Sequence, residues 1–183
     1  QWRREGTEFS YGDLTQMAAD APAFGALIVS GENRFLAPFN MPMTIQSFCQ
    51  ETGQTVPQEK GAIIRCALES LALEYRWVAE QIDRIIGKHF PVIHIIGGGS
   101  KNKLLNQFTA NSTGRTVITG PAEATAVGNI LVQAIAMGDI ASLADGRAIV
   151  KKSFDVETYE PNDIPAWDEA YERYMELNIR SSR

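Results

Sequence analysis

An apolar run that ends in three consecutive glycines constrains the fold of this chain more than any other feature. The run VIHII at residues 92–96 is β-branched and apolar on both faces, which is typical of a central parallel strand rather than an edge strand. Three glycines follow at 97–99, and Ser100 is well placed to cap a helix that begins there. The order strand, glycine turn and helix predicts a turn whose exposed N–H groups can meet a polar or anionic ligand.

The segments around this turn alternate between helical and strand patterns. Residues 57–87 repeat apolar side chains at alternating steps of four and three, which predicts one long amphipathic helix with Pro57 in its first turn and Gly87 at its end. After the turn we expect a helix that ends at Gly114, a strand at 116–119 and a helix at 121–137. This alternation predicts a three-layer α/β domain with a mostly parallel portion of sheet. The apolar stripe of the long helix comprises Ile64, Leu68, Leu71, Tyr75, Val78, Ile82 and Ile85.

The two ends of the chain have weaker patterns. The N-terminal part predicts helices at 13–19 and 44–52 and a strand at 26–30. Toward the C-terminus we expect a helix at 141–152, an irregular connection at 155–163 and a helix at 166–179, whose apolar face carries Trp167, Tyr171 and Tyr174.

The composition is that of one soluble globular domain. Of 183 residues, 44% are hydrophobic and 21% are charged, which suffices for a full core. The net charge of −5 leaves no basic surface for phosphates, so we expect no nucleic-acid partner. No apolar run approaches the roughly 20 residues of a membrane span, so we expect no membrane partner and a cytoplasmic protein. The first residue is Gln1 rather than methionine, which favours a piece of a longer protein.

Few residues in this chain suit a metal. Cys49 and Cys66 are the only cysteines, and two thiols without a neighbouring histidine cluster cannot complete a tetrahedral zinc site. We interpret His89 and His94 as structural, since His94 lies inside an apolar strand pattern. The sequence therefore predicts no metal ligand within this chain.

The glycine run does not match two familiar nucleotide sites. A P-loop has the pattern G-x-x-x-x-G-K-[ST], and a dinucleotide-binding turn has G-x-G-x-x-G. Neither spacing is completed after Gly99, because Asn102 stands where the last dinucleotide glycine belongs. Two interpretations stay open at this point: a ligand-binding turn, or a tight connection between strand and helix.

Two longer runs make the sequence recognisable. GGGSKNKLLNQ at 97–107 and GPAEATAVGN at 120–129 resemble the C-terminal domain of the FGGY family of carbohydrate kinases, and most of all its rhamnulokinase branch. The resemblance extends over essentially the whole chain. It implies that residues 1–183 are the C-terminal nucleotide-binding domain of a two-domain sugar kinase, whose N-terminal sugar-binding and catalytic domain is absent from this chain. The implied fold is a ribonuclease-H-like α/β domain, of the type of actin, hexokinase and chaperone ATPases, with three layers and a mixed sheet.

The resemblance also implies partners and site residues. The cofactors would be ATP and Mg²⁺, and the substrate would be a ketose, L-rhamnulose, which becomes L-rhamnulose 1-phosphate. The main chain at Gly97, Gly98 and Gly99 is expected to meet the nucleotide, with Gly98 at the usual ATP-contact position, and Asn102 is expected to reach the adenine. The catalytic base belongs to the missing domain, so no catalytic residue is predicted in this chain and the chain alone is expected to be inactive.

Other residues of the second run receive structural interpretations. Gly128, inside an expected helix, is interpreted as a close-packing site. Glu123 is interpreted as a carboxylate in the first turn, where it opposes the positive end of the helix dipole. We expect Asp13, Asp20 and Asp83 to be solvated surface carboxylates.

The two cysteines have two alternative states. Members of the rhamnulokinase branch can carry a disulfide at this spacing, and Cys49 and Cys66, which are 66 − 49 = 17 positions apart, match that pair. Against this, the reducing cytosol favours free thiols.

Three alternative functions remain. The chain can belong to a kinase of another sugar or polyol of the same family, such as xylulose, fuculose or glycerol. It can be a non-catalytic interaction module in which the helix at 57–87 mediates association. It can also be an actin-like or chaperone-like ATPase, which would share the glycine turn but not the run at 120–129.

Overall fold

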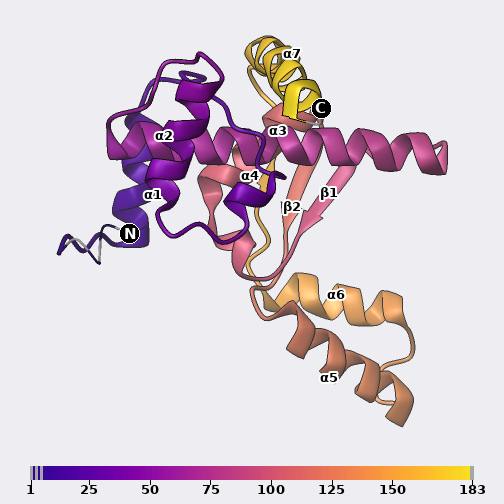
Figure 1. The fold of residues 1–183 in the computed structure, drawn as a ribbon. Helices are drawn as coiled ribbons and strands as arrows, with labels where there is room; N and C mark the ends of the chain where they lie inside the picture. Colours follow the sequence, from indigo (N-terminus) through magenta and orange to yellow (C-terminus); the bar gives the residue numbers. More distant parts are fainter. Residues whose placement is uncertain (1, 3, 5, 182–183) are drawn as a thin grey trace.

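The chain folds into a mixed α/β domain with seven α-helices and three short strands among the residues that the structure describes. The computed structural model describes residues 2, 4 and 6–181, so Gln1, Arg3, Glu5, Ser182 and Arg183 lie outside it. Figure 1 shows a long central helix with the strands beside it. The elements in chain order are α1 (Tyr11–Asp20), η1 (Asn33–Phe35), α2 (Met41–Glu51), α3 (Lys60–Ile86), β1 (Val92–Ile95), η2 (Gly98–Lys101), α4 (Lys103–Thr113), β2 (Thr116–Thr119), α5 (Ala124–Met137), α6 (Leu143–Ser153), β3 (Thr158–Tyr159) and α7 (Ile164–Ser181).

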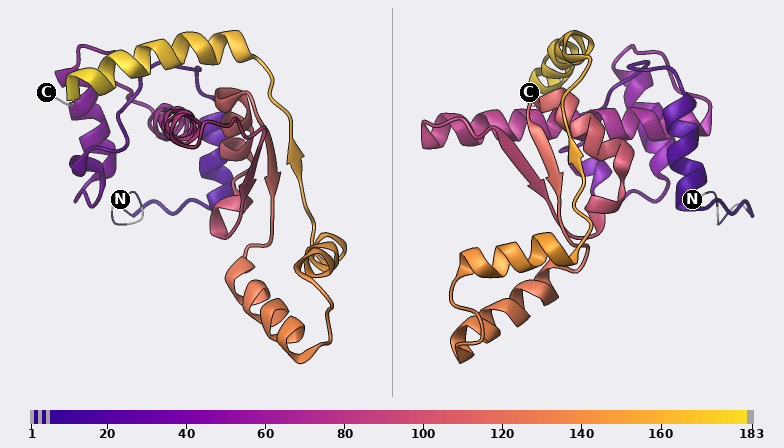
Figure 2. Two further views of the ribbon diagram at one scale, coloured as in Figure 1. Left: turned by 90° about the vertical axis from the view of Figure 1, so that its right-hand side faces the viewer. Right: turned by 180° about the vertical axis from the view of Figure 1, so that it is seen from behind.

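The sheet is small and mixed. Its strand order is β1-β2-β3, with β1 parallel to β2 and β3 antiparallel to β2. The register pairs Val92 with Thr116 and Ile95 with Thr119, so α4 forms the crossover between two parallel strands. Helices α3 and α4 lie on one face of the sheet (Figure 2). The α/β class with a mixed sheet, expected from the sequence, is confirmed.

The core lies around the N-terminal half of α3. Its buried side chains come from α3 itself, from residues 26–29 and Phe35, and from α1, α2, α4 and α7. Gly61 lets α1 approach closely, because a methyl group at this position would stand 2.3 Å from the carbonyl oxygen of Met17. Helix α7 closes the core from the other side with Trp167, Tyr171 and Tyr174, as its apolar face predicted. The predicted helix and the observed one therefore agree in position and in buried face.

The predicted strand at 26–30 is wrong. Residues 26–29 are buried but have no strand partner, and side chains satisfy their main-chain groups instead. Gln54 accepts from the Leu27 N–H and donates to the Leu27 carbonyl, at 2.9 and 2.8 Å, and the Ser70 hydroxyl accepts from the Ile28 N–H at 2.9 Å. These bonds give the segment the main-chain partners that a sheet would otherwise supply.

The apolar stripe predicted for the long helix is buried only in part. Helix α3 starts at Lys60, later than predicted, so Pro57 precedes it rather than lying in its first turn; Gly87 ends it in the left-handed conformation, with φ of 71°. Leu68 is buried, whereas Val78 and Ile82 are 40% and 45% exposed. The C-terminal half of the stripe therefore faces outward in this chain.

Strand β1 is an edge strand, which contradicts the predicted central position. Only β2 pairs with it among residues 2, 4 and 6–181, and Val92 is 37% exposed. Similarly, the connection expected at 155–163 contains β3, which extends the sheet beyond β2. Strand β1 therefore has the composition of a central strand but the position of an outer one.

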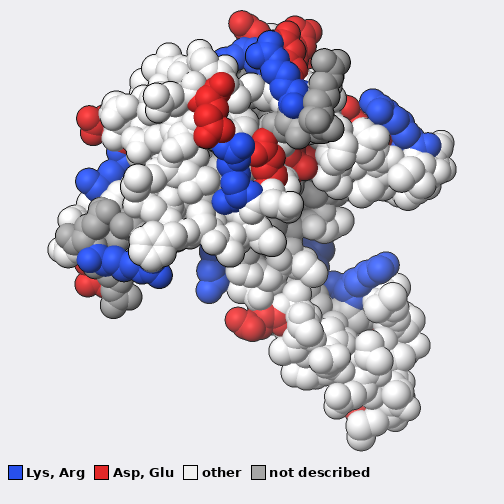
Figure 3. Space-filling view, in the orientation of Figure 1, with Lys and Arg blue, Asp and Glu red and all other residues white. Residues whose placement is uncertain are grey.

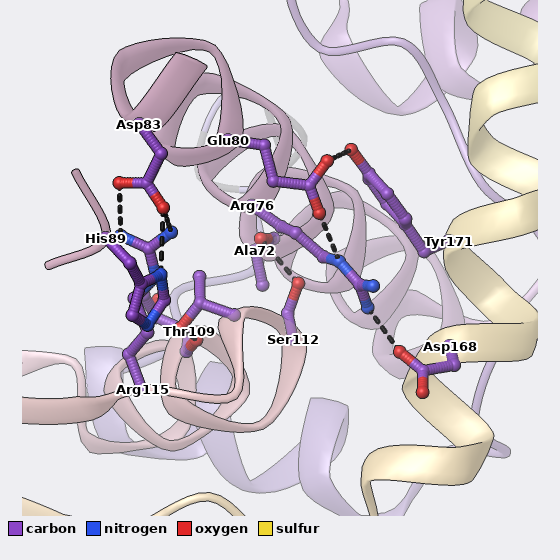
Figure 4. A network of polar contacts seen from close by, with 11 residues as sticks. Ala72, Arg76, Glu80, Asp83, His89, Thr109, Ser112, Arg115, Asp168 and Tyr171 are labelled. Carbon is purple, nitrogen blue, oxygen red and sulfur yellow. Dashed lines mark hydrogen bonds and ion pairs between the residues drawn. The ribbon is translucent and has the colours of Figure 1, made fainter. Parts of the chain in front are cut away.

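Polar contacts tie α3 to its neighbours (Figure 4). The Ser112 hydroxyl in α4 donates to the Ala72 carbonyl at 2.8 Å, and Arg76 lies 2.6 Å from Asp168 in α7. Near the end of α3, the carboxylate of Asp83 accepts from Arg115 at 2.7 Å. The expectation of a solvated Asp83 is therefore wrong, because this carboxylate is paired with a cation from across the fold.

Asp13 and Asp20 also have partners. Asp13 forms a capping box with Ser10 at the start of α1, in which each side chain bonds to the other's main-chain N–H. Asp20 accepts from the Gln16 side chain at 2.8 Å. Both carboxylates lie at the surface as predicted, but each one stabilises a helix end or face.

Helices α5 and α6 form a hairpin that projects away from the core (Figures 1 and 2). No residue of α5 is buried. Gly128 lies in this helix with no atom within 4 Å of where its Cβ would be, so the predicted close-packing role is wrong for this chain. Across the part of the chain that the structure describes, we find no helix long and apolar enough to cross a membrane.

Candidate functional site

The glycine turn connects the end of β1 to the start of α4. Gly97 adopts φ of 78° and ψ of −163°, a combination open to glycine almost alone, and its carbonyl accepts from the Ser100 N–H at 3.1 Å. Gly98 and Gly99 are the first two residues of the short 3₁₀ turn η2. The backbone conformation at position 97 therefore requires a glycine.

Gly98 differs from its two neighbours. It does not have a positive φ, and a methyl group added there would meet no atom within 4 Å. At Gly99 a methyl group would make an ordinary contact, 3.9 Å from Ile95 Cγ2. Neither backbone strain nor packing in this chain requires a glycine at 98. The residue lies exposed, on a surface where the main chain is accessible.

Asn102, not Ser100, caps α4. Its side-chain oxygen accepts from the Leu105 N–H at 3.1 Å, whereas the Ser100 hydroxyl donates to the Gly97 carbonyl at 2.7 Å. The predicted cap at Ser100 is wrong because η2 takes up one more turn before the α-helix starts. Asn102 is only 6% exposed, and its side-chain oxygen is committed to this cap.

Asn106, a residue that sequence reasoning missed, hydrogen-bonds to the main chain of the turn. It is fully buried, and its amide nitrogen donates to the Ser100 carbonyl at 2.9 Å. Its side-chain oxygen has no hydrogen-bond partner among the described residues. The sequence signal that could have identified Asn106 is an asparagine on the inward face of a helix. A buried side-chain amide is usually hydrogen-bonded, and often to a main-chain group.

The two glycine-containing runs meet in the structure. The Gly97 N–H donates to the Pro121 carbonyl at 3.1 Å, and the Gly120 N–H donates to the Ile95 carbonyl at 2.8 Å. A methyl group at Gly120 would stand 2.9 Å from Ile96 Cγ2, so this glycine permits the close approach. Both runs therefore form one surface at the carboxyl ends of the parallel strands β1 and β2, the usual ligand position in parallel α/β sheets.

Charged residues stand near this surface. Lys103 pairs with Glu157, and the Tyr159 hydroxyl donates to the same carboxylate. The hydrogen bond from Lys103, with that from Tyr159, lowers the pKa of Glu157. Lys103 and Glu157 are 54 positions apart, so no local spacing could have predicted the pair.

Glu123 occupies the N-cap position of α5, one residue before the first turn in which it was predicted. Its side chain makes no capping hydrogen bond. It lies exposed at the positive end of the helix dipole, where a carboxylate is favourable.

The described residues contain no group of three or more His, Cys, Asp or Glu side chains that could hold a metal ion. His89 lies beside Asp83, with 2.9 Å between Nδ1 and the carboxylate, and His94 lies in β1. The open main chain at Gly98 fits a nucleotide, but a Mg²⁺ ion on its phosphates would need ligands other than such a cluster.

The cysteines are free thiols, buried between α2 and α3. They contact each other: a hydrogen bond from Cys66 lowers the pKa of Cys49, and the same bond, together with burial, raises the pKa of Cys66. The disulfide stays a prediction.

Comparison with known proteins identifies a family whose model matches this chain. The model of the FGGY family of carbohydrate kinases, C-terminal domain, matches residues 1–137. The chain is 43% identical over 162 residues to the rhamnulokinase of Bacteroides thetaiotaomicron, covering 88% of this chain and 33% of the relative. It is 38% identical over 182 residues to the rhamnulokinase of Enterococcus faecalis, covering 98% and 36%. The chain thus spans about a third of the length of these curated relatives.

Solved structures show the same fold. The xylulose kinase of Rhodospirillum rubrum matches with a TM-score of 0.65 and 23% identity over 94% of this chain and 35% of that one. The Plasmodium falciparum glycerol kinase with ADP matches with a TM-score of 0.70 and 15% identity over 97% and 35%. At these identities the likeness extends to the fold alone.

Proposed function

This chain belongs to the FGGY family of carbohydrate kinases, and we propose that it is the nucleotide-binding part of an enzyme that transfers the γ-phosphate of ATP to L-rhamnulose. The observation that carries the proposal is the exposed main chain at Gly98, a position where neither backbone conformation nor packing in this chain requires a glycine. A ligand that lies flat against the turn explains why no side chain is present there.

The surroundings of Gly98 support a nucleotide as this ligand. Lys101 and Lys103 provide positive charge beside the turn, and Lys103 is 73% exposed even in its pair with Glu157. The N-terminus of α4 follows directly, with the positive end of its dipole. We propose that Gly97, Gly98 and Gly99 meet the nucleotide through their main chain, and that Asn102 reaches the adenine.

The choice of sugar rests on relatives. Rhamnulokinases at about 40% identity favour L-rhamnulose, with L-rhamnulose 1-phosphate as the product, over xylulose, fuculose or glycerol. The sugar site, the catalytic base and the Mg²⁺ ligands are proposed to lie in the further length that the relatives have. Closure of the two parts over the substrates would exclude water and align the sugar hydroxyl with the γ-phosphate.

Nucleotide titration tests the ATP site directly. In the NMR spectrum of the chain, ATP is expected to shift the amides at 97–102 more strongly than GTP does. Gly98→Val should abolish these shifts and leave the rest of the spectrum unchanged, because its side chain points into open space. Gly25→Val is the matched control, at a second open glycine without a positive φ that lies outside both glycine-containing runs. An unchanged affinity for ATP in folded Gly98→Val protein contradicts the site.

The full-length enzyme tests the sugar. Phosphorylation rates with L-rhamnulose, xylulose, fuculose and glycerol are compared at equal ATP, and L-rhamnulose should have the highest kcat/KM. The preference for another sugar would overturn the substrate but leave the nucleotide site intact.

A further inference from the structure

The helical backbone is interrupted between the 3₁₀ turn η2 and helix α4. Asn102, where the two meet, has φ of −86° and ψ of 86°, which is not a helical conformation. The first main-chain hydrogen bond of α4 runs from the Asn106 N–H to the Asn102 carbonyl at 2.9 Å. The Ser100 carbonyl lies before the interruption, and the side-chain amide of Asn106 donates to it, also at 2.9 Å. Asn106 therefore bonds to the main chain on both sides of the interruption.

The side chain of Asn106 is unfavourable for the stability of the fold. It is fully buried, and its oxygen has no hydrogen-bond partner among the described residues. An unpaired buried acceptor costs more free energy than a typical hydrogen bond contributes. Leucine has the same branching without polar atoms, so it would remove the unpaired oxygen in exchange for the one bond to Ser100. Stability therefore does not explain an asparagine at this position.

Additional polypeptide does not explain it either. Asn106 has no exposed surface, so a segment outside this chain could reach its oxygen only by displacing the residues that cover it. The only side-chain hydrogen bond that Asn106 makes to a described residue is the one to Ser100, in the glycine turn. The geometry of the turn is therefore what the asparagine serves.

The main chain of the turn has little help from charged side chains on the side of α5. The run at 120–129 contributes one charged residue, Glu123, whose negative charge disfavours a phosphate. Helix α5 has no charged residue, and Figure 3 shows few charged side chains on the visible face of the projecting hairpin. The directions of the main-chain groups therefore matter for a ligand at this surface, and a contact that fixes them can control its affinity.

We propose that Asn106 is a positioning residue for the nucleotide. Its bond to the Ser100 carbonyl keeps η2 separate from α4, in the arrangement that presents the main chain of residues 97–99 and the side chain of Asn102 to ATP. Without this bond, Asn102 can adopt a helical conformation, which joins η2 to α4 and turns the glycine main chain away from the ligand. Asn106 itself touches no ligand, because it has no exposed surface. The inference rests on the proposed function, since it requires that ATP binds at the turn.

Asn106→Leu in the full-length kinase tests the proposal. The loss of one hydrogen bond that acts on the turn should raise the Kd for ATP by about 3- to 10-fold. The KM for ATP should rise by a similar factor and kcat should stay within about twofold, because Asn106 is remote from the reacting atoms. The Tm should stay unchanged or rise, because the substitution removes an unpaired buried oxygen. A residue that served only the fold would lower the Tm and leave the Kd unchanged.

Asn106→Ala is the second variant. It removes the same hydrogen bond without filling the site, so an equal rise in the Kd for ATP in both variants excludes a steric effect of leucine. Its Tm should be lower than that of Asn106→Leu, because the smaller side chain leaves a cavity.

Asn111→Leu is the matched control. Asn111 lies in the same helix and is 6% exposed. Its oxygen accepts from the Asn162 N–H at 3.0 Å and from the Gln107 side chain at 2.7 Å, and its amide donates to the Asn162 side chain at 3.0 Å. None of these bonds reaches the glycine turn. Asn111→Leu should therefore lower the Tm and leave the Kd for ATP unchanged, the reverse of the result expected for Asn106→Leu.

Three results would overturn the inference and leave the proposed function intact. One is an unchanged Kd for ATP in folded Asn106→Leu and Asn106→Ala enzyme. Another is an equal loss of ATP affinity in Asn111→Leu, which would identify general destabilisation as the cause. The third is the loss of the folded state in both Asn106 variants, which would show that the fold requires the amide. If ATP shifts no amide at 97–102 in the wild type, the proposed function fails and the inference fails with it.

Discussion

Arg115 Nη2 lies 2.7 Å from Asp83 Oδ2, which joins the residue before β2 to the last turn of α3. Arg115 is 6% exposed although it carries a full charge, and its Nε has no hydrogen-bond partner among the described residues. Asp83 also accepts from His89, on the connection to β1 (Figure 4). One carboxylate therefore connects the long helix to the segments that lead into both parallel strands.

Asp83→Asn should destabilise the protein at neutral pH, because it leaves the buried Arg115 without a counter-charge. Burial opposes ionisation, but hydrogen bonds from His89 and Arg115 outweigh it and hold the pKa of Asp83 below its ordinary value. A lowered pKa gives stability that is present at neutral pH and is lost as the pH falls through the folded-state value. The Tm difference between wild type and Asp83→Asn should therefore shrink below about pH 4.

Thermal unfolding between pH 3 and 7 measures this difference. His89→Gln is the control: its side chain is 65% exposed, so it should lower the Tm much less than Asp83→Asn does. A pH-independent difference between wild type and Asp83→Asn would mean that the charge of Asp83 is not what stabilises the fold.

Gly97→Ala should destabilise the fold, in contrast to Gly98→Ala. The φ of 78° and ψ of −163° at Gly97 lie in a region that an alanine occupies at a cost of about 1–3 kcal/mol. At Gly98 an added methyl group meets nothing and no positive φ is present, so the stability should hardly change. Urea unfolding of both variants compares the two free energies, and equal losses would refute the distinction between the two glycines.

Gly61→Ala should weaken the contact between α1 and α3. Its methyl group would stand 2.3 Å from the carbonyl oxygen of Met17, and main chain cannot move aside as a flexible side chain can. The expected loss of unfolding free energy is about 1–3 kcal/mol, typical of overpacking.

Gly128→Ala is the opposite case and a matched control, since both glycines lie inside helices. No atom stands within 4 Å of the added methyl group. Alanine should therefore stabilise α5 by about 0.5–1 kcal/mol through backbone entropy alone. Circular dichroism during urea unfolding measures both variants, and a destabilised Gly128→Ala chain would show that this position packs against something after all.

Oxidation should join Cys49 and Cys66 without rearranging the core. The thiols already contact each other across the α2–α3 interface. A bridge over 66 − 49 = 17 positions should raise the unfolding free energy by about 3 kcal/mol through the entropy of the unfolded chain. The measurement is urea unfolding of protein treated with oxidised glutathione, beside reduced protein. Cys49→Ser is the control and should not respond; the absence of a bridge in treated wild type would leave the pair as free thiols.

Local sequence determined a large part of this fold. The apolar period at 57–87 determined α3, and the left-handed glycines Gly87 and Gly114 ended α3 and α4 where predicted. Strands β1 and β2 follow from β-branched runs, and the glycine turn and the run at 120–129 pointed to the family. Such features depend on neighbours within a few positions, so a sequence is enough to recognise them.

Tertiary structure alone decided the rest. Residues 26–29 looked like a strand, but Gln54 and Ser70, 27 and 42 positions away from their partners, bond to their main chain. The pairing of Asp83 with Arg115 spans 32 positions and replaced an expected surface carboxylate. Sequence showed three glycines, and only the three-dimensional backbone separated the strained Gly97 from the open Gly98. Contacts over such separations depend on how helices and strands pack, which no local pattern encodes. Hydrogen bonds from side chains also compete with sheet hydrogen bonds of comparable energy for the same main-chain groups.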